Sequence, residues 1–414
     1  MLDIKFIREN ASEVQEKSKQ KGYEVDVEQL LGFDTKRREL RLKVEELRRE
    51  RNVLADAVKG KKPGTEQIAK GRAVKENLSV LEHQYASIDK EFQTLLALIP
   101  NIAASDVPVG GEENNLEIKK VGEQKKSAVD HLDLAVKKGW LDFERGSKVS
   151  GNKFYFVKGD LAMLENAITQ YALDFIIKKG FNYMTVPHMV NSRIAAGTGF
   201  SPRTSDQSDE YFIEGEDLTL IASAEIPLTG FHADEILDEK DLPLNYAALS
   251  PCYRKEAGTY GKHNRGLFRV HQFNKLEMYA FTLPEESVQM HQKILSIEEE
   301  LWQAVGVPYR VINIASGDLG AQASKKYDIE YWSPVDNVYR ELSSCSNCTD
   351  YQARNVNIRV RNKKGDTVIP HTLNGTVVSL SRAMVAIIEN FQTKDGDVIV
   401  PEVLRTFMQG KEKI

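Results

Sequence analysis

Residues 250–281 decide the fold, and they read SPCYRKEAGTYGKHNRGLFRVHQFNKLEMYAF. The order of apolar and polar residues predicts a strand, a long polar loop and a second strand, which together make a hairpin. The loop, residues 257–266, contains three glycines, two cations and a histidine. Such a loop can fold over a polyanion, because arginine presents a rigid fork of donors that matches phosphate.

The second strand of the hairpin carries charged and aromatic side chains at every other position. Side chains alternate between the two faces of a strand. One face is therefore expected to hold Leu267, Arg269, His271, Phe273, Lys275 and Glu277. The first strand repeats the arrangement with Arg254 and Glu256. This face can bind phosphate and stack a base, but an amphipathic hairpin with a solvated charged face has the same pattern.

The composition indicates a globular protein with two or more domains. The chain has 414 residues, of which 41% are apolar and 28% are charged, and these shares are ordinary for a soluble protein. It contains no apolar run of about 18 residues, so we expect no membrane span. The first ten residues have mixed charge and do not predict a secretory signal. Three cysteines without a framework of pairs favour the cytoplasm.

Two kinds of motif are weak or absent. Cys345 and Cys348 form a lone C-x-x-C. Zinc needs four ligands, and no second pair lies nearby, so we expect no zinc. The sequence has no G-x-x-x-x-G-K-[ST], no G-x-G-x-x-G after a strand and no H-E-x-x-H. A nucleotide would therefore be bound without those loops.

Two N-terminal helices are predicted to pair as an antiparallel coiled-coil arm. Apolar residues recur at heptad spacing from Phe33 to Val58, and again in steps of four and three from Val74 to Ile99. Residues 59–64, KGKKPG, break the helix between the two runs. Each helix would be about 50 Å long at 1.5 Å per residue.

The first helix of the arm and the turn carry an excess of positive charge. The whole chain has a net charge of −5, so a nucleic acid would need such a local basic patch. The cations expected to face it are Arg37, Arg38, Arg41, Arg48, Arg49, Lys59, Lys61 and Lys62. A solvated coiled coil with internal ion pairs would carry the same charges, and the spacing alone leaves both interpretations open.

Three motifs resemble those of a known family. They are RGLFRVHQFNKLE at 265–277, ELSSCSNCTDYQAR at 341–354 and HTLNGT at 371–376. In this order, over nearly the whole chain, the sequence resembles the seryl-tRNA synthetases of class II. The resemblance implies an α+β fold with an antiparallel sheet flanked by helices, plus an N-terminal antiparallel helical coiled-coil arm. It implies a tRNA-binding domain over 1–105 and a class II catalytic domain over 106–414.

The resemblance also implies an activity. It is the ATP-dependent ligation of L-serine to tRNA(Ser) through a seryl-adenylate, with tRNA(Sec) as a further expected substrate. The serine carboxylate must attack the α-phosphorus of ATP. Because both groups are anionic, cations and Mg²⁺ must neutralise their repulsion. ATP is thus expected as a substrate, Mg²⁺ as the metal, the arm as the contact for tRNA, and a cytoplasmic homodimer with no membrane contact as the form.

Site residues follow by resemblance, position by position. The catalytic residues expected are Arg254, Arg269 and Arg382. Those expected to bind ATP are Arg254, Lys255, Glu256, Phe273, Glu341, Leu342, Ser343, Ser344 and Arg382. Those expected to bind serine are Ser223, Ala224, Glu225, Arg254, Glu277, Asn374 and Thr376. Glu341 and Ser344 are expected to hold the magnesium.

The chain departs from the family at two of these positions. Ser223 stands where many bacterial members have threonine, and Thr376 stands where they have serine. Both exchanges keep a hydroxyl. Around Thr376, we predict a strand over Thr367–His371, a loop over 374–376 and a helix around Ser381–Gln392.

Two other functions remain as alternatives. An amino-acid:carrier-protein ligase shares the synthetase core, but such proteins resemble synthetases without the arm. An inactive tRNA-binding paralogue would be expected to lose Arg254, Glu341 or Arg382, and all three are present.

Overall fold

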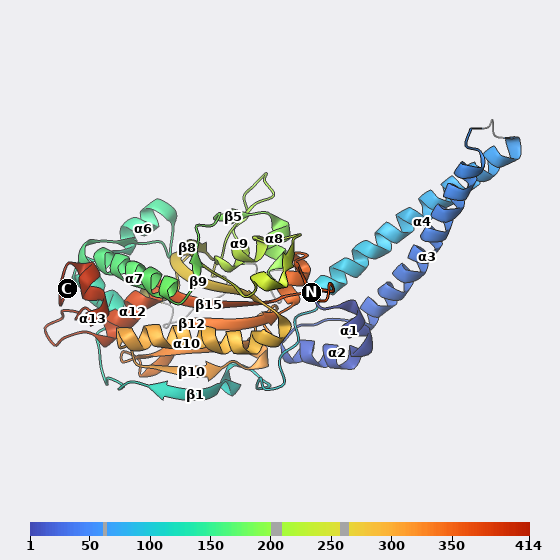
Figure 1. Ribbon diagram of the computed structural model, residues 1–414. Helices are drawn as coiled ribbons and strands as arrows, with labels where there is room; N and C mark the ends of the chain where they lie inside the picture. Colours follow the sequence, from blue (N-terminus) through green and yellow to red (C-terminus); the bar gives the residue numbers. More distant parts are fainter. Residues whose placement is uncertain (61–63, 200–208, 257–264) are drawn as a thin grey trace. The chain divides into compact units, whose positions relative to one another are not determined.

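The computed structural model describes residues 1–60, 64–199, 209–256 and 265–414. The contacts within the chain divide it into two compact units, Met1–Pro100 and Asn101–Ile414 (Figure 1). Lys61 and Lys62 of the predicted basic turn lie outside the described residues. No helix in the described part of the chain is both long enough and apolar enough to cross a membrane.

The first unit is helical. Its helices are α1 (Ile4–Glu9), α2 (Ala11–Gln20), α3 (Val27–Ala57) and α4 (Thr65–Leu98). The side chain of Asp26 caps α3 by accepting a hydrogen bond from the backbone N–H of Gln29. Helices α3 and α4 run side by side for most of their length (Figure 1). The predicted arm is therefore confirmed as a pair of long helices.

The seam between α3 and α4 is apolar at the heptad positions and ionic at its base. Val44 of α3 and Val74, Leu78 and Phe92 of α4 are buried. The Arg37 guanidinium lies 3.8 Å from the centre of the Phe92 ring. It also pairs with Asp34 at 3.3 Å and with Asp89 at 3.2 Å. Arginine therefore fills a heptad position by covering a ring while carboxylates balance its charge.

The second unit is built on one sheet. Among the described residues its eight strands are, in sheet order, β1 (Leu116–Val121), β10 (Tyr309–Asn313), β11 (Lys325–Ser333), β12 (Val338–Thr349), β15 (His371–Ser379), β9 (Gln272–Thr282), β8 (Leu244–Tyr253) and β4 (Asn182–Tyr183). Every neighbouring pair is antiparallel except β4 and β8. The predicted antiparallel sheet is confirmed.

Shorter strands and the helices surround this sheet. The short strands are β2 (Leu141–Asp142), β3 (Phe156–Val157), β5 (Met189–Val190), β6 (Thr219–Leu220), β7 (Ile236–Asp238), β13 (Arg359–Arg361) and β14 (Thr367–Val368). The helices are α5 (His131–Lys137), α6 (Phe143–Ser150), α7 (Gly159–Lys178), α8 (Ser192–Gly197), α9 (Glu225–Gly230), α10 (Ser287–Val305), α11 (Tyr351–Asn355), α12 (Leu380–Asn390) and α13 (Glu402–Arg405).

Helix α10 covers one face of the central strands β12 and β15 (Figure 1). Gly375 of β15 faces this helix so closely that an added Cβ would lie 2.3 Å from Ile294. Because strand residues alternate, Asn374 and Thr376 must face the other way. The face opposite α10 is therefore the one that is free to carry a site.

The hairpin of residues 250–281 differs from its prediction in one respect. Strands β8 and β9 pair as expected, from Leu244 opposite Phe281 to Tyr253 opposite Gln272. The segment before Gln272 is not a strand, because Gly266–Phe268 forms a 3-10 helix. Gly266 has a φ of +61°, and Leu267 is fully buried in the core. The chain thus turns inward to bury Leu267 before it enters the sheet.

The predicted loop at 374–376 is wrong, because these residues lie inside β15. Gly375 pairs with Cys345 of β12 on one side and with Met278 of β9 on the other. Hydrogen bonding to two neighbours overrides the turn preference of Asn-Gly. The predicted helix after it is confirmed as α12.

Candidate active site

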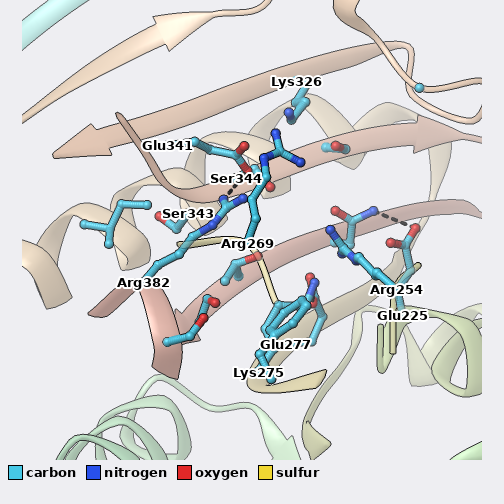
Figure 2. A pocket seen from close by; sticks show the side chains of 18 of the residues that line it. Glu225, Arg254, Arg269, Lys275, Glu277, Lys326, Glu341, Ser343, Ser344 and Arg382 are labelled. Carbon is cyan, nitrogen blue, oxygen red and sulfur yellow. Dashed lines mark hydrogen bonds and ion pairs between the residues drawn. The ribbon is translucent and has the colours of Figure 1, made fainter. Parts of the chain in front are cut away.

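One pocket of about 300 Å³ lies on the face of the sheet opposite α10. Its walls come from β9, β12, β15 and the start of α12, with Lys326 of β11 at one side. Figure 2 shows Glu341, Ser344, Arg269 and Arg382 on one side of the pocket and Arg254 with Glu225 on the other. The pocket therefore has two ends, one at Glu341, Arg269 and Arg382 and the other at Glu225 and Arg254.

The alternation of β9 places three predicted residues in this pocket. Phe273, Lys275 and Glu277 all line it, and so does Arg269, which precedes the strand in an extended conformation. The two other residues expected on this face lie elsewhere. Leu267 is buried in the core. The Nδ1 of His271 donates to the Arg254 carbonyl oxygen at 3.0 Å, and its ring packs on Phe154 and Tyr211. The face prediction is confirmed along β9 and at Arg269, and it is wrong at Leu267 and His271.

The first end of the pocket is a set of arginine–carboxylate pairs. Arg382 donates to Glu341 at 2.8 Å, and Arg269 donates to Glu256 at 2.7 Å. Burial acts to raise the pKa of Glu341, but Arg382 and Lys326 outweigh it and lower this pKa to about 2. Glu341 is therefore ionised at neutral pH. The arginines are held in place by carboxylates and present the remaining guanidinium donors to the cavity.

Arg254 lines the pocket on the same side as Glu225 (Figure 2). Its Nε donates to the Ala222 carbonyl oxygen at 3.3 Å. Its guanidinium carbon lies 5.3 Å from the centre of the Phe273 ring. The backbone N–H of Arg254 donates to the His271 carbonyl oxygen at 3.0 Å, just beyond the end of β8. Arg254 and Phe273 thus form one cationic and aromatic wall, which is suited to a phosphate and a planar base.

The second end of the pocket is polar and buried. Glu225 accepts hydrogen bonds from Asn374 at 2.8 Å and from Gln352 at 2.7 Å. Glu277 pairs with Lys275 and accepts from the Ser223 hydroxyl at 3.1 Å. Burial, reinforced by the neighbouring charge of Glu277, raises the pKa of Glu225 to about 7. Two carboxyl groups that share one small space are suited to receiving a cation such as an ammonium.

The structure brings most of the predicted site residues together. The predicted residues that line the pocket are Glu225, Arg254, Glu256, Arg269, Phe273, Glu277, Glu341, Leu342, Ser343, Ser344, Asn374, Thr376 and Arg382. Three others are not among the pocket-lining residues. Ser223 lies beneath Glu277, and Ala224 is buried in an apolar cluster. The Lys255 ammonium lies over the rings of Tyr211 and Phe212.

A β-bulge brings the two predicted magnesium ligands to one face. Glu341 and Ser344 are three residues apart, so a regular strand would point them to opposite faces. The register between β11 and β12 shifts between the pair Ser343–Ile329 and the pair Glu341–Glu330. The extra residue restores a common face, and both side chains reach the pocket. A similar shift in β15 lies between Thr376 and Val378.

The donor set at Glu341 and Ser344 fits Mg²⁺. An ionised carboxylate and a hydroxyl are hard oxygen donors, and Mg²⁺ commonly takes one or two protein ligands plus phosphate oxygens and waters. Within the described ranges there is no group of three or more His, Cys, Asp or Glu side chains that could hold a metal ion. The site therefore suits a metal that arrives together with a phosphorylated substrate.

Two further residues that the sequence did not predict act at the site: Lys326 lines the pocket, and Gln352 holds Glu225 by a hydrogen bond. Lys326 lies in β11 and pairs with Asp328 at 3.0 Å, beside Glu341. Gln352 lies in α11 and links Glu225, Tyr279 and Thr372 by hydrogen bonds. Lys326 is one lysine in an alternating strand, and Gln352 stands in a short helix. Lys326 has no sequence signal that separates it from an ordinary surface lysine, whereas Gln352 lies within the motif at 341–354, from which no role was predicted for it.

The C-x-x-C motif lies in β12 behind the second end of the pocket. Cys345 and Cys348 are both fully buried, and neither forms a disulfide bond. The Asn374 amide lies 3.8 Å from the Cys348 Sγ, whereas His291 contacts the Cys345 carbonyl oxygen from α10. Cys348 therefore lies beside the pocket residue Asn374, whereas the backbone of Cys345 contacts α10.

Two family models match the chain. Residues 210–391 match the tRNA synthetase class II core domain (G, H, P, S and T), and residues 1–103 match the seryl-tRNA synthetase N-terminal domain. The fold and the pocket thus define a class II aminoacyl-tRNA synthetase.

Similar proteins narrow the class to one family. The chain is 43% identical over 418 residues to the serine–tRNA ligase of Dictyoglomus turgidum, and the aligned region covers 99% of this chain and 98% of that protein. The crystal structure of seryl-tRNA synthetase from Pyrococcus horikoshii complexed with ATP is 41% identical, with a TM-score of 0.89 and coverage of 100% and 99%. The cytoplasmic serine–tRNA ligase of Naegleria fowleri in complex with AMP is 33% identical, with a TM-score of 0.86 and coverage of 100% and 98%. The chain belongs to the seryl-tRNA synthetase family.

Proposed function

We propose that this protein is a serine–tRNA ligase, which joins L-serine to tRNA(Ser) through a seryl-adenylate. One observation carries the proposal. A single pocket combines Arg254, Arg269 and Arg382 with the buried carboxyl groups of Glu225 and Glu277. The arginines suit a triphosphate and the carboxyl groups suit an amino acid, as the reaction requires. The solved relatives from P. horikoshii and N. fowleri, which hold ATP and AMP, support the nucleotide.

In this proposal each end of the pocket binds one substrate. Glu225 and Glu277 receive the serine ammonium, and Asn374 and Thr376 lie beside the serine hydroxyl. Phe273 stacks against the adenine, with Arg382 on the other side of the base, and Glu256 receives the adenine amino group. A buried hydrogen-bonding partner for the hydroxyl would reject alanine, because that partner would be left unpaired.

The first step is an in-line displacement at the α-phosphorus. The serine carboxylate attacks, the bond to the bridging oxygen breaks, and pyrophosphate leaves toward the end formed by Arg269 and Arg382. Arg254 lies between the substrates, where negative charge develops. No protein nucleophile takes part, so positioning and charge neutralisation supply the rate. Glu341 and Ser344 would hold the Mg²⁺, which neutralises phosphate charge when bound.

The second step transfers serine to the terminal hydroxyl of tRNA, and we propose the arm as the contact for the tRNA. Arg38, Arg49 and Lys59 are exposed on the described part of the arm and are the cations best placed for a phosphate backbone. Arg41 and Arg48 are also exposed but engage Glu45 and Glu82. The same contact would serve tRNA(Sec), which we propose as a second substrate.

We also propose a cytoplasmic homodimer with the domain boundary near residue 105. None of the three cysteines, which all lie in described ranges, forms a disulfide bond, and this supports a reducing compartment. Exposed apolar side chains of α7, Met163 at 40% and Ile177 at 52%, support a partner surface on that helix.

The experiment that tests the function is ATP–pyrophosphate exchange with each of the twenty amino acids, followed by charging of total tRNA. We expect exchange with serine alone and serine attached to tRNA. Exchange without charging of tRNA would favour a carrier-protein ligase. A folded protein without any exchange would favour an inactive paralogue. Purified tRNA(Ser) and tRNA(Sec) transcripts then test the two tRNA substrates separately.

A further inference from the structure

Helix α5 holds the segment that leads from the hairpin loop into β9. His131, the first residue of α5, is 4% exposed. Its Nε2 accepts a long hydrogen bond of 3.4 Å from the backbone N–H of Leu267. Its Nδ1 lies 2.9 Å from the Glu389 carboxylate of α12. Because the amide can only donate and a carboxylate accepts, Nε2 is the acceptor and Nδ1 is the donor in this bridge.

The partner carboxylate is itself fixed. The second oxygen of Glu389 accepts from the Ser333 hydroxyl at 2.7 Å and from the Tyr331 hydroxyl at 3.2 Å. Glu389 is 4% exposed, so its charge is shielded from water and satisfied by three donors. His131 is therefore attached to a rigid point in the core rather than to a mobile side chain.

The neighbours of Leu267 show that the backbone contact shapes the segment. An added Cβ at Gly266 would lie 2.4 Å from Nε2 of His131. Gly266 has a φ of +61°, which glycine adopts readily. Arg265 pairs with Asp133 of the same helix at 3.4 Å. Residues 265–267 thus all contact α5, and a residue larger than glycine does not fit at position 266.

This contact connects the two elements that carry the phosphate-facing arginines. Leu267 stands two residues before Arg269, and Glu389 stands on α12 about two turns after Arg382. Phe268 contacts both elements. Its ring lies 5.1 Å from the Arg382 guanidinium of α12 and 5.4 Å from the Arg340 guanidinium of β12. A shift of Leu267 would move Phe268 and Arg269 together, relative to Arg382.

We propose that His131 is a positioning residue for ATP: bridging Leu267 and Glu389, it fixes Arg269 and Phe268 relative to Arg382 at the triphosphate end of the pocket. This proposal rests on the proposed function. The serine end of the pocket is built on other residues, Glu225, Glu277 and Asn374. Loss of the bridge should therefore affect ATP and leave serine nearly unaffected.

Two variants attack the contact from opposite sides. His131→Asn keeps an amide donor near Glu389 but is too short to reach Leu267. Gly266→Ala keeps His131 but places a methyl group against Nε2. For each variant we expect the KM for ATP in serine-dependent exchange to rise about tenfold. This is the change in affinity expected when one hydrogen bond is lost and the residues it positions shift. The KM for serine should change less than about twofold.

The double variant and a matched control sharpen the test. Because both changes break one contact, the double variant should raise the KM for ATP little beyond either single variant. His232→Asn is the control, since His232 also bridges a glutamate, Glu235 at 2.6 Å, and a second partner, the Tyr246 hydroxyl at 2.9 Å. Hydrogen exchange of the peptide over 265–268 should quicken in His131→Asn and not in the control.

Equal increases in the KM for ATP and for serine, additive single effects, or an unchanged rate of hydrogen exchange would overturn the proposal. If the wild-type protein shows no exchange, the proposed function fails instead. The contact is then judged by hydrogen exchange and by direct binding of ATP, which should weaken about tenfold in His131→Asn if the proposal holds. If His131→Asn does not fold, Gly266→Ala alone decides the question.

Discussion

Arg254 is the residue whose removal should affect chemistry most directly. It lines the pocket on the side of Glu225, beside Phe273, and its Nε donates to the Ala222 carbonyl oxygen. We expect Arg254→Ala to lower serine-dependent exchange by about 100- to 1000-fold, the usual effect of deleting one donor at a developing charge. Thermal unfolding should change little. Exchange at the wild-type rate would exclude the proposed role.

Glu225 should make serine binding depend on pH. Burial and the charge of Glu277 raise its pKa to about 7. Only the ionised carboxyl attracts an ammonium, so the proton must leave before or during binding. We therefore expect the KM for serine to fall as the pH rises from about 6 to about 8 and to level off above the pKa. Glu225→Gln should bind serine weakly and without this dependence, measured at saturating ATP.

Glu298 should make stability depend on pH in a defined direction. It is fully buried in α10 under the pocket floor, where Ser343 donates to it at 3.0 Å. Burial, with Glu277 and Asp328 nearby, raises its pKa well above the ordinary value. The folded protein then binds a proton that the unfolded chain releases, so stability is lost as pH rises above the ordinary glutamate range.

Replacing Glu298 by glutamine removes that proton uptake. We expect the unfolding temperature of Glu298→Gln, relative to the wild type, to be higher at about pH 8 than at about pH 5. Glu286→Gln, which changes an exposed glutamate at the start of the same helix, is the control and should show no such difference. A Glu298→Gln effect of equal size at both pH values would contradict the assignment.

At the scale of elements, the arm can be shortened while the contacts among Arg37, Asp89 and Phe92 are kept. Lys43 of α3 and Gln84 of α4 border the same shallow groove, so a short glycine linker can join them in place of residues 44–83. The Arg37–Asp89–Phe92 contacts remain. We expect exchange to persist and tRNA charging to be lost, because Arg48, Arg49 and Lys59 go with the deletion. Charging at the wild-type rate would disprove the role of the arm.

The elements also show where pattern reading succeeds and fails. Long heptads predicted α3 and α4, and alternation placed Phe273, Lys275 and Glu277 on one face. The same rule failed at Leu267 and His271, since the chain is not a strand there. It would also have separated Glu341 from Ser344, which only a bulge against β11 brings together. A bulge depends on pairing with a neighbouring strand, so it cannot be predicted from the sequence of one strand alone.

At the scale of the whole molecule, the proposed homodimer can be tested by mass. We expect sedimentation equilibrium to give twice the mass of a single chain, because we propose that the exposed apolar side chains of α7 contact a second copy. The mass should be unchanged in the arm-shortened variant apart from the deleted residues. A monomer at micromolar concentration would mean that this surface has another role.

The sequence by itself determined the class of fold, the helical arm and the residue types of the site. The arm follows from heptad periodicity, whereas the class of fold and the site residues follow from motifs that resemble those of the seryl-tRNA synthetases. Tertiary structure alone decided which residues from distant segments line or support the pocket. Lys326, Gln352 and the His131–Glu389 bridge come from segments far apart in the chain. Their roles arise from strand register, bulges and burial, which exist only once the sheet has formed.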